Sequence, residues 1–395
     1  MSSDFSEFAE MAAGPRASAS PVAVPEYSRI ALLGGGEDAR LVAALCLAEG
    51  AEVVLFSAYG AELAAMRASS GISLRGTGPV GTYQIDRDGA PSVRTTAELD
   101  TAVRDAEVIF LTGPVHKQRT YAMVLADHLT DGQILVLAPG RSLGALETAW
   151  LLRIGGSTAD VTIVEAQGLP YWVGAEGAVL NLTEAGTPVA ATLPSGRERV
   201  LSGLNRFLPS VSKDSVVASG FADGSALVEF SALLMGGPAL GAGAVAVPMG
   251  GTPLPENRTF ATLIGPEQRR VIELLAGERR AVACAYGIRD LPDTDTWITC
   301  HAGAGRGAGA RPVPDRDGAK RLLRDGVIGS LVPLESAARL ATVDVPVTRS
   351  MITLASAVLG ADVAAAGRRL DTIGIDADDV DDARRAMDRI AVGGR

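Results

Sequence analysis

The chain has 395 residues, 47% of them hydrophobic, and a formal net charge of −10. Its length predicts roughly two or three domains, and the acidic balance argues against nucleic acid or an anionic membrane surface as the main partner. The three cysteines are far apart and form no CxxC pair, which is typical of a reducing, cytoplasmic environment. Residues 1–27 carry early acids and many Ser, Ala and Pro residues, and they predict a flexible tail rather than a secretory leader.

The first predicted element is a complete βαβ unit. The apolar run 30–33 predicts a strand, a glycine-rich turn and a small-residue helix follow, and 53–56 predicts a second strand. The turn reads G-x-G-x-x-A, in which Gly34 allows the tight turn, Gly36 lets the backbone approach a pyrophosphate, and Ala39 lets the helix lie close to the strand. The free N–H groups at the start of that helix would then face phosphates. The unit therefore predicts a bound dinucleotide.

Strands and helices continue to alternate up to about residue 165. The predicted strands are 72–74, 82–85, 108–111, 134–137 and 161–165, and the predicted helices are 96–105, 117–129 and 145–154. Strands that alternate with helices of this length predict an α/β fold with a doubly wound, Rossmann-type parallel sheet. We assign this dinucleotide-binding domain to residues 28–194.

From residue 195 the apolar periodicity becomes helical. The predicted helices are 197–207, 226–235, 266–286, 318–323, 334–340, 347–359 and 378–392. We therefore expect residues 195–395 to form an all-α domain for substrate binding and dimerisation. The nearly charge-free stretch 226–248 predicts a buried helix with a broken end rather than a membrane span. The Ala/Gly-rich stretch 302–310 predicts either a flexible connection or a mobile lid.

Ligands of open α/β sheets lie beyond the carboxyl ends of the strands, so the loops at that edge supply the candidate cofactor contacts. These residues are Gly34, Gly36, Ala39, Ser57, Gly113, Pro114, His116, Pro139 and Gly140.

The second strand indicates which nicotinamide cofactor to expect. An NAD site usually has an acid at the end of this strand to hold the ribose 2′-OH, but here the strand ends in Ser57. The absence of an acid permits a 2′-phosphate, and Arg67 or Arg40 could supply the positive charge. The sequence therefore favours NADP, with NAD as the alternative, although both arginines could equally be ordinary surface residues.

Four segments carry a family resemblance. They are FLTGPVHKQRTYAMVLADHLTDGQILVLAPGRSLGALE (110–147), AGERRAVACAYGI (276–288), RLLRDGVIGSLVPLESAARL (321–340) and VPVTRSMITLASAVLGADVAAAGRRLDTIGI (345–375). In order and spacing the chain resembles the opine dehydrogenases of the octopine and nopaline dehydrogenase type. The resemblance implies a nucleotide-binding domain joined to a helical substrate domain. It also implies reductive condensation of an α-keto acid with the amino group of an amino acid.

The departures from the family pattern concern proton transfer. The family uses a His-Asp pair, with the histidine in a His-Pro step whose counterpart here is Gly237-Pro238. The aspartate lies five residues after a family arginine, and counting from Arg321 reaches Gly326. Both members of the pair are therefore expected to be missing. Arg321 itself is kept, and the resemblance implies that it helps to hold a substrate carboxylate, for which a bidentate guanidinium is suited.

Other residues must then deliver the proton, and the sequence leaves two main candidates. His116, at the end of a central strand, is either catalytic or a cofactor-side residue. Glu229 stands alone in an apolar helix, where its pKa would be raised so that it acts as an acid, or else it pairs with an arginine such as Arg321. His301, expected on an exposed loop, and Tyr171 are weaker candidates, and Trp172 is expected to pack at the domain junction.

The leading hypothesis is an NAD(P)-dependent oxidoreductase that reduces a C=N or C=O bond of an amino-acid-derived substrate carrying a carboxylate. We expect a homodimer. No zinc-ligand spacing, nucleophile elbow or Walker-type loop is present, so no metal site is expected. The alternative is a dinucleotide-binding sensor or partner protein that has lost its catalytic pair.

Overall fold

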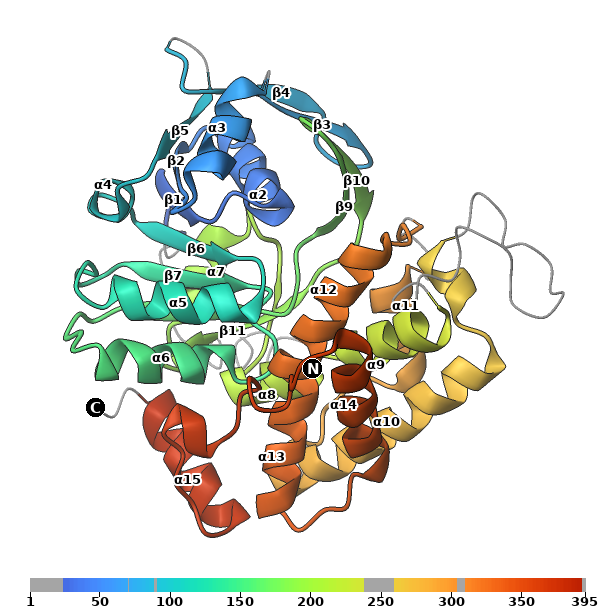
Figure 1. Cartoon of the computed structure of the whole chain (residues 1–395). Coiled ribbons are helices and arrows are strands. Elements are labelled where there is room, and N and C mark those ends of the chain that lie inside the picture. The colour runs from blue at the N-terminus through green and yellow to red at the C-terminus, as the bar shows by residue number, and fades with distance from the viewer. Residues whose placement is uncertain (1–23, 70, 89–90, 238–258, 304–309, 393–395) are drawn as a thin grey trace, which may run out of the picture.

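The computed structural model describes residues 24–69, 71–88, 91–237, 259–303 and 310–392. A large sheet with flanking helices forms one half of the molecule, and a bundle of helices packs against it to form the other half (Figure 1). The predicted α/β fold with a Rossmann-type sheet followed by a helical domain is confirmed. The predicted tail and the 302–310 stretch fall largely outside the described residues.

The strands form one sheet in the order β12-β11-β8-β7-β6-β1-β2-β5-β4-β3-β10-β9. Their bounds are β1 Arg29–Leu33, β2 Glu52–Phe56, β3 Ile72–Gly76, β4 Gly81–Ile85, β5 Ser92–Thr96, β6 Val108–Thr112, β7 Ile134–Ala138, β8 Thr162–Ala166, β9 Tyr171–Glu176, β10 Val179–Glu184, β11 Val189–Leu193 and β12 Val211–Ser212.

The centre of the sheet is parallel. Strand β1 lies between β2 and β6, and β6, β7 and β8 follow in parallel register. Every residue of β6 and β7 is buried, which is the continuous apolar pattern expected of strands covered on both faces. Because these strands run in one direction, the loops that follow β1, β2, β6 and β7 lie along the same carboxyl edge.

The outer strands differ from the prediction. Strands β9 and β10 form an antiparallel hairpin that continues the sheet beyond β3, and β11 pairs antiparallel with β8. None of these three strands was predicted. The predicted helix 96–105 was wrong at its start because Thr96 ends β5, which pairs with β2. The helix there is α4, Leu99–Val103.

Helices cover both faces of the sheet and build the second half of the chain. Those of the first half are α2 Glu37–Ala48, α3 Gly60–Ala68, α5 Val115–Leu125, α6 Gly144–Ile154 and α7 Arg199–Leu204. Those of the second half are α8 Val216–Ala222, α9 Ser225–Phe230, η1 Ser231–Met235, η3 Phe260–Leu263, α10 Pro266–Ala285, α11 Thr294–Ala302, α12 Arg316–Gly326, η4 Val327–Leu331, α13 Val332–Leu340, α14 Pro346–Leu359, η5 Asp371–Ile373 and α15 Val380–Ala391.

Each helix predicted after residue 195 has a counterpart in the structure, but α8, α11 and the short turns η3, η4 and η5 were not predicted. By length and composition alone, the run Val216–Met235 could cross a membrane, yet 89% of its most apolar window is buried inside the protein. The run is interrupted at Asp223 and Gly224 and ends in a π-helical turn. The predicted buried helix with a broken end is therefore what the described part of 226–248 forms.

The end of the chain returns to the sheet half. Helix α15 packs against α6 (Figure 1), and Ser195 donates a backbone hydrogen bond of 2.7 Å to Ala391. Strand β12 also joins the sheet after residue 194. The proposed boundary between residues 194 and 195 stays a prediction.

Candidate active site

The glycine turn lies at the carboxyl end of β1 and leads into α2. Gly34 has a φ of 113°, a conformation that favours glycine, and it donates a hydrogen bond of 2.9 Å to Phe56 at the end of β2. A Cβ added at Gly36 would meet nothing within 4 Å. Helix α2 begins after Gly36 with no side-chain cap, so its first N–H groups are open to an anion. Ala39 is buried against the sheet, as the motif predicts.

A carboxylate that the sequence analysis did not identify, that of Glu62, lies beside the end of β2. Ser57 is fully buried and donates a hydrogen bond to Glu62 in the first turn of α3. A Cβ added at Gly35 would lie 2.6 Å from Cδ of Glu62. The Glu62 side chain therefore lies directly over the glycine turn.

Both arginines proposed for a 2′-phosphate have partners elsewhere. Nε of Arg67 lies 3.0 Å from Asp86 and 2.9 Å from Thr95. Nη1 of Arg40 donates at 2.7 Å to the carbonyl oxygen of Gly177, in the β9–β10 turn. The structure therefore does not bring either guanidinium to Ser57.

His116 stands in the first turn of α5, at the carboxyl edge as predicted. The preceding N–H, that of Val115, donates at 2.6 Å to Asp325 at the end of α12. Desolvation of the imidazole lowers the pKa of His116, the charge of Asp325 opposes this shift, and the charge of Lys117 adds to it. His116 therefore lies where the two halves of the chain meet.

Glu229 is buried and paired with two arginines. It accepts a 2.7 Å hydrogen bond from Arg311 and lies 3.3 Å from Arg141, which also approaches Asp325 at 3.6 Å. Burial alone would raise the pKa of Glu229, but the two guanidinium groups hold it below its ordinary value. The expectation of a raised pKa for Glu229 is wrong. The two arginines that lower it, Arg141 and Arg311, come from loops distant in sequence from α9.

His301 lies in α11 rather than on an exposed loop. It is half-buried, and its burial lowers the pKa to about 4 despite the opposing charges of Asp223 and Glu229. Its carbonyl oxygen accepts a 2.5 Å hydrogen bond from Arg311. The loop expectation for His301 was wrong, since Asp293 caps a helix that continues past this residue.

A chain of charged residues thus connects the glycine turn to the helical half. Asp38, at the start of α2, is half-buried, and desolvation together with the charges of Glu37 and Asp325 raises its pKa to about 6. From Asp325 the chain continues through Arg141 and Glu229 to Arg311.

The remaining predicted residues lie at the margin of this cluster. Arg321 is exposed on α12, one turn before Asp325, and no described side chain pairs with it. The guanidinium of Arg311 lies 5.6 Å from the ring centroid of Trp172, so Trp172 packs at the junction as predicted. The ring of Tyr171 instead lies against Gly78.

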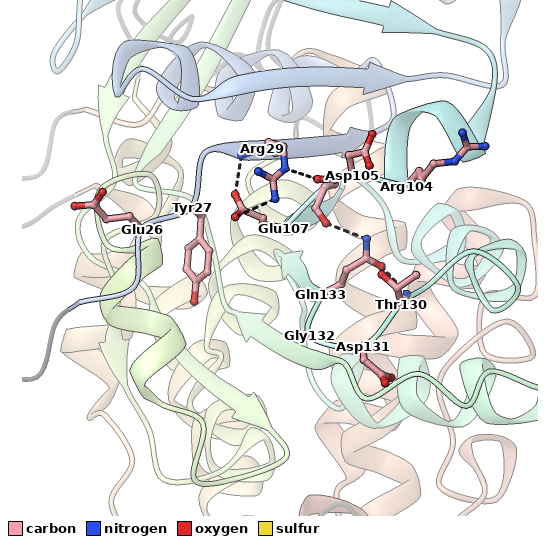
Figure 2. Close-up of a pocket in the computed structure, with 11 residues that line it drawn as sticks. Glu26, Tyr27, Arg29, Arg104, Asp105, Glu107, Thr130, Asp131, Gly132 and Gln133 are labelled. Atoms are coloured by element: carbon pink, nitrogen blue, oxygen red, sulfur yellow. Dashed lines mark hydrogen bonds and ion pairs between the residues drawn. The ribbon is translucent and has the colours of Figure 1, made fainter.

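A hollow lies at the opposite edge of the sheet. Figure 2 shows Arg29, Glu107 and Gln133 around it, near the amino ends of β1, β6 and β7. Gln133 caps the backbone there by donating at 2.9 Å to Ala106. A dinucleotide bound at the glycine turn would not reach this edge, so we do not assign the hollow to the cofactor.

Comparison with known proteins fits this arrangement. The chain is 24% identical over 364 residues to an opine dehydrogenase from Arthrobacter sp. (strain 1C), covering 89% of this chain and 96% of that protein. The chain is therefore similar to an opine dehydrogenase over most of its length. No protein-family model matches it.

Solved structures support the same fold. An octopine dehydrogenase complex with NADH and L-arginine has a TM-score of 0.66 at 18% identity, covering 93% of this chain and 98% of that one. A PanE/ApbA family ketopantoate reductase from Ralstonia eutropha JMP134 has a TM-score of 0.58 at 15% identity, covering 84% of this chain and 98% of that one.

Segments that carry the resemblance meet near the loop after β7. Arg368 donates to the carbonyl oxygens of Gly140 and Ser142 at 2.8 and 3.0 Å. Arg279, from the segment 276–288, donates to Ser330 of the segment 321–340 and, at 3.5 Å, to the hydroxyl of Ser142 in the same loop. The arginines of these segments, although far apart in sequence, therefore fix the loop after β7 against the helical half.

The departures from the opine dehydrogenase pattern also have a structural basis. A Cβ at Gly326 would lie 3.3 Å from Cβ of Ala226, so a larger side chain there would press against α9. Gly237 has a φ of 100°, which a histidine rarely adopts, and its neighbour Pro238 lies outside the described residues.

Sequence reasoning missed several residues of this site, namely Glu62, Arg141, Glu165, Asp223 and Arg311. Glu165 is fully buried at the end of β8, accepts a 2.8 Å hydrogen bond from Ala145, and contacts Gly140. Burial raises its pKa to about 8. Only Arg141 had a signal in the sequence, because it ends the PGR step quoted for the resemblance.

Proposed function

We propose that the chain is an NAD(P)-dependent oxidoreductase that reduces a C=N or C=O bond of an amino-acid-derived substrate. The observation that carries this proposal is the uncapped amino end of α2 behind Gly34 and Gly36, at the sheet edge that faces the charged residues of the helical half. The Arthrobacter relative is named an opine dehydrogenase, and the octopine dehydrogenase structures hold NADH with L-arginine or with pyruvate. Both support reduction of an imine formed from a keto acid and an amino acid.

The residues at the glycine turn fit a dinucleotide. Gly36 leaves open space beside free N–H groups, and a bound nicotinamide dinucleotide would supply the hydride. We propose that the turn and the loops after β2, β6 and β7 hold this cofactor. The residues are Gly34, Gly36, Ala39, Ser57, Gly113, Pro114, His116, Pro139 and Gly140.

We further propose that Arg321 holds the substrate carboxylate. Arg321 is exposed on α12, the helix whose last turn carries Asp325. The planar guanidinium of an arginine suits a carboxylate. A substrate held there would lie on the side of α12 that leads to Asp325 and His116.

Of the two catalytic candidates, the geometry favours His116. It lies at the carboxyl edge, where it would take a proton from solvent and donate it to the nitrogen or oxygen as the hydride reaches the carbon. Glu229 is ionised between Arg141 and Arg311, which supports a positioning role for this carboxylate instead of proton donation.

The choice between NAD and NADP depends on Glu62. The sequence favoured NADP because no acid ends β2, but the hydrogen bond from Ser57 to Glu62 brings a carboxylate to that point. This contact and the occupied arginines Arg67 and Arg40 support NAD over NADP.

We also propose a cytoplasmic homodimer that forms through the helical half. Leu274 of α10 and Leu354 of α14 are 52% and 46% exposed, and the two helices pack side by side. A contiguous apolar surface across these two helices would favour association.

The proposal is tested by incubating the purified protein with NADH or NADPH and a panel of keto acids, alone and with amino acids, and following loss of the reduced nicotinamide. Turnover supports the enzyme. Binding of a dinucleotide without turnover across the panel would instead support the sensor or partner protein.

A further inference from the structure

We infer that Glu62 binds the adenosine ribose of the cofactor. Its carboxylate would accept a hydrogen bond from the ribose 2′-OH and thereby favour NAD over NADP. The inference rests on the proposed function, since it concerns the same dinucleotide site. It follows from the position of the Glu62 carboxylate between the end of β2 and the glycine turn.

Three contacts fix that position. Oε2 of Glu62 accepts a hydrogen bond from Ser57, the residue that follows β2. The hydrogen bond from Gly34 to Phe56 draws the glycine turn against the same strand end. Between the two, the Glu62 side chain covers Gly35, where an added Cβ would lie 2.9 Å from Oε2. A larger residue at position 35 would displace the carboxylate from this position.

The Glu62 carboxylate lies where NAD-binding sites usually have an acidic residue. In dinucleotide-binding βαβ units the ribose 2′-OH meets a carboxylate beside the second strand, at the edge that also carries the glycine turn. Here the strand ends in a serine, and the acid comes from the first turn of α3 instead. The Ser57 hydroxyl orients it, and Ser57 is itself fully buried, so the carboxylate is held rather than free in solvent.

The charges around Glu62 disfavour a 2′-phosphate. Arg67 is engaged by Asp86 and Thr95, and Arg40 by the carbonyl oxygen of Gly177. Lys117 of α5 lies 5.2 Å from the ring centroid of Tyr59, the residue that precedes α3. A phosphate placed against Glu62 would therefore meet a like charge, which is repulsive in a partly buried site.

The test measures the dissociation constants of NADH and NADPH for the full chain and for Glu62→Gln. The unmodified protein is expected to bind NADH at least tenfold more tightly. In Glu62→Gln, NADH affinity should fall roughly tenfold and NADPH affinity should rise, since a charged hydrogen bond is worth about that factor or more. Glu62→Asp keeps the charge and should keep the preference for NADH, and Glu49→Gln, at the exposed far end of α2, should change neither constant.

Three outcomes would overturn the inference while leaving the proposed function intact. They are equal affinity for the two dinucleotides in the unmodified protein, a preference for NADPH, and an unchanged affinity ratio in Glu62→Gln. A reversal of the ratio in Lys117→Ala, with Glu62→Gln unchanged, would assign the selection to the lysine. If the unmodified protein binds neither dinucleotide, the proposed function fails, and the inference fails with it.

Discussion

The guanidinium of Arg368 donates a hydrogen bond of 2.8 Å to the carbonyl oxygen of Gly140, a residue 228 positions earlier in the chain. The same side chain pairs with Glu147 in α6 and is 1% exposed. Gly140 belongs to the loop after β7 that we assign to the cofactor. The position of that loop therefore depends on a residue of the helical half.

Replacing Arg368 with alanine should destabilise the protein strongly. The change leaves Glu147 buried with one partner fewer and removes the donor to two loop carbonyls, and breaking such a buried pair costs about 3–5 kcal/mol. Urea unfolding measures the loss. Arg369→Ala is the matched control, because its pair with Asp371 is partly exposed and should contribute less than about 1 kcal/mol. Equal effects in both variants would contradict the account.

Gly36→Asp should abolish dinucleotide binding without unfolding the protein. A side chain fits at this position, and aspartate is a good N-cap for α2, so stability should hold or rise. The new charge would face the pyrophosphate and weaken binding by roughly a hundredfold. Gly36→Asn, with the same shape but no charge, should lose much less. Calorimetric titration with NADH and NADPH makes the comparison, and unchanged binding in Gly36→Asp would remove the argument for the cofactor site.

Glu165 should make the protein less stable as the pH rises. Its pKa is raised from 4.5 to about 8 in the folded state, so unfolding releases a proton between these values. Stability is therefore greatest below pH 4.5 for this group and falls by up to about 1.4 kcal/mol per pH unit as the pH rises towards 8. Glu165→Gln should remove that slope, whereas Glu176→Gln, at an exposed position, should retain it. Urea unfolding at several pH values measures this dependence. The same slope of unfolding free energy against pH in the unmodified protein and in both variants would contradict the raised pKa of Glu165.

Glu229→Gln should lower activity and stability without moving the midpoints of the pH–rate profile. The lowered pKa of Glu229 means that its contribution to stability is present above its ordinary pKa of 4.5 and is lost as the pH falls through the folded value. At neutral pH the variant leaves Arg141 and Arg311 less compensated, at a cost of about 3–5 kcal/mol. If the change in rate near neutral pH disappears in Glu229→Gln, the carboxylate of Glu229 would instead be identified as the proton donor.

The local parts of the fold and site could be predicted from sequence. The glycine turn, the central strands and most helices depend on short-range patterns, so Gly34, Gly36 and the buried runs of β6 and β7 were placed correctly. The hairpin β9–β10 was missed because its partially buried strands lack the continuous apolar run of the central sheet.

The charged parts of the site could not be predicted in this way. Glu62 reaches Ser57 only because α3 turns back over the glycine turn. The partners of Glu229 come from the loop after β7 and from Arg311, and nothing in the sequence around position 229 indicates them. The pKa expectation for Glu229 failed for that reason.

The central claim is that the chain reduces a substrate with a nicotinamide dinucleotide, and the most direct test is a turnover measurement. The purified protein is supplied with NADH, an α-keto acid and an amino acid, and the initial rate of NADH loss is compared with the rates when either organic substrate is omitted. We predict dinucleotide consumption that requires the keto acid and increases when the amino acid is added. Tight NADH binding with no consumption across a broad panel of such pairs would contradict the claim.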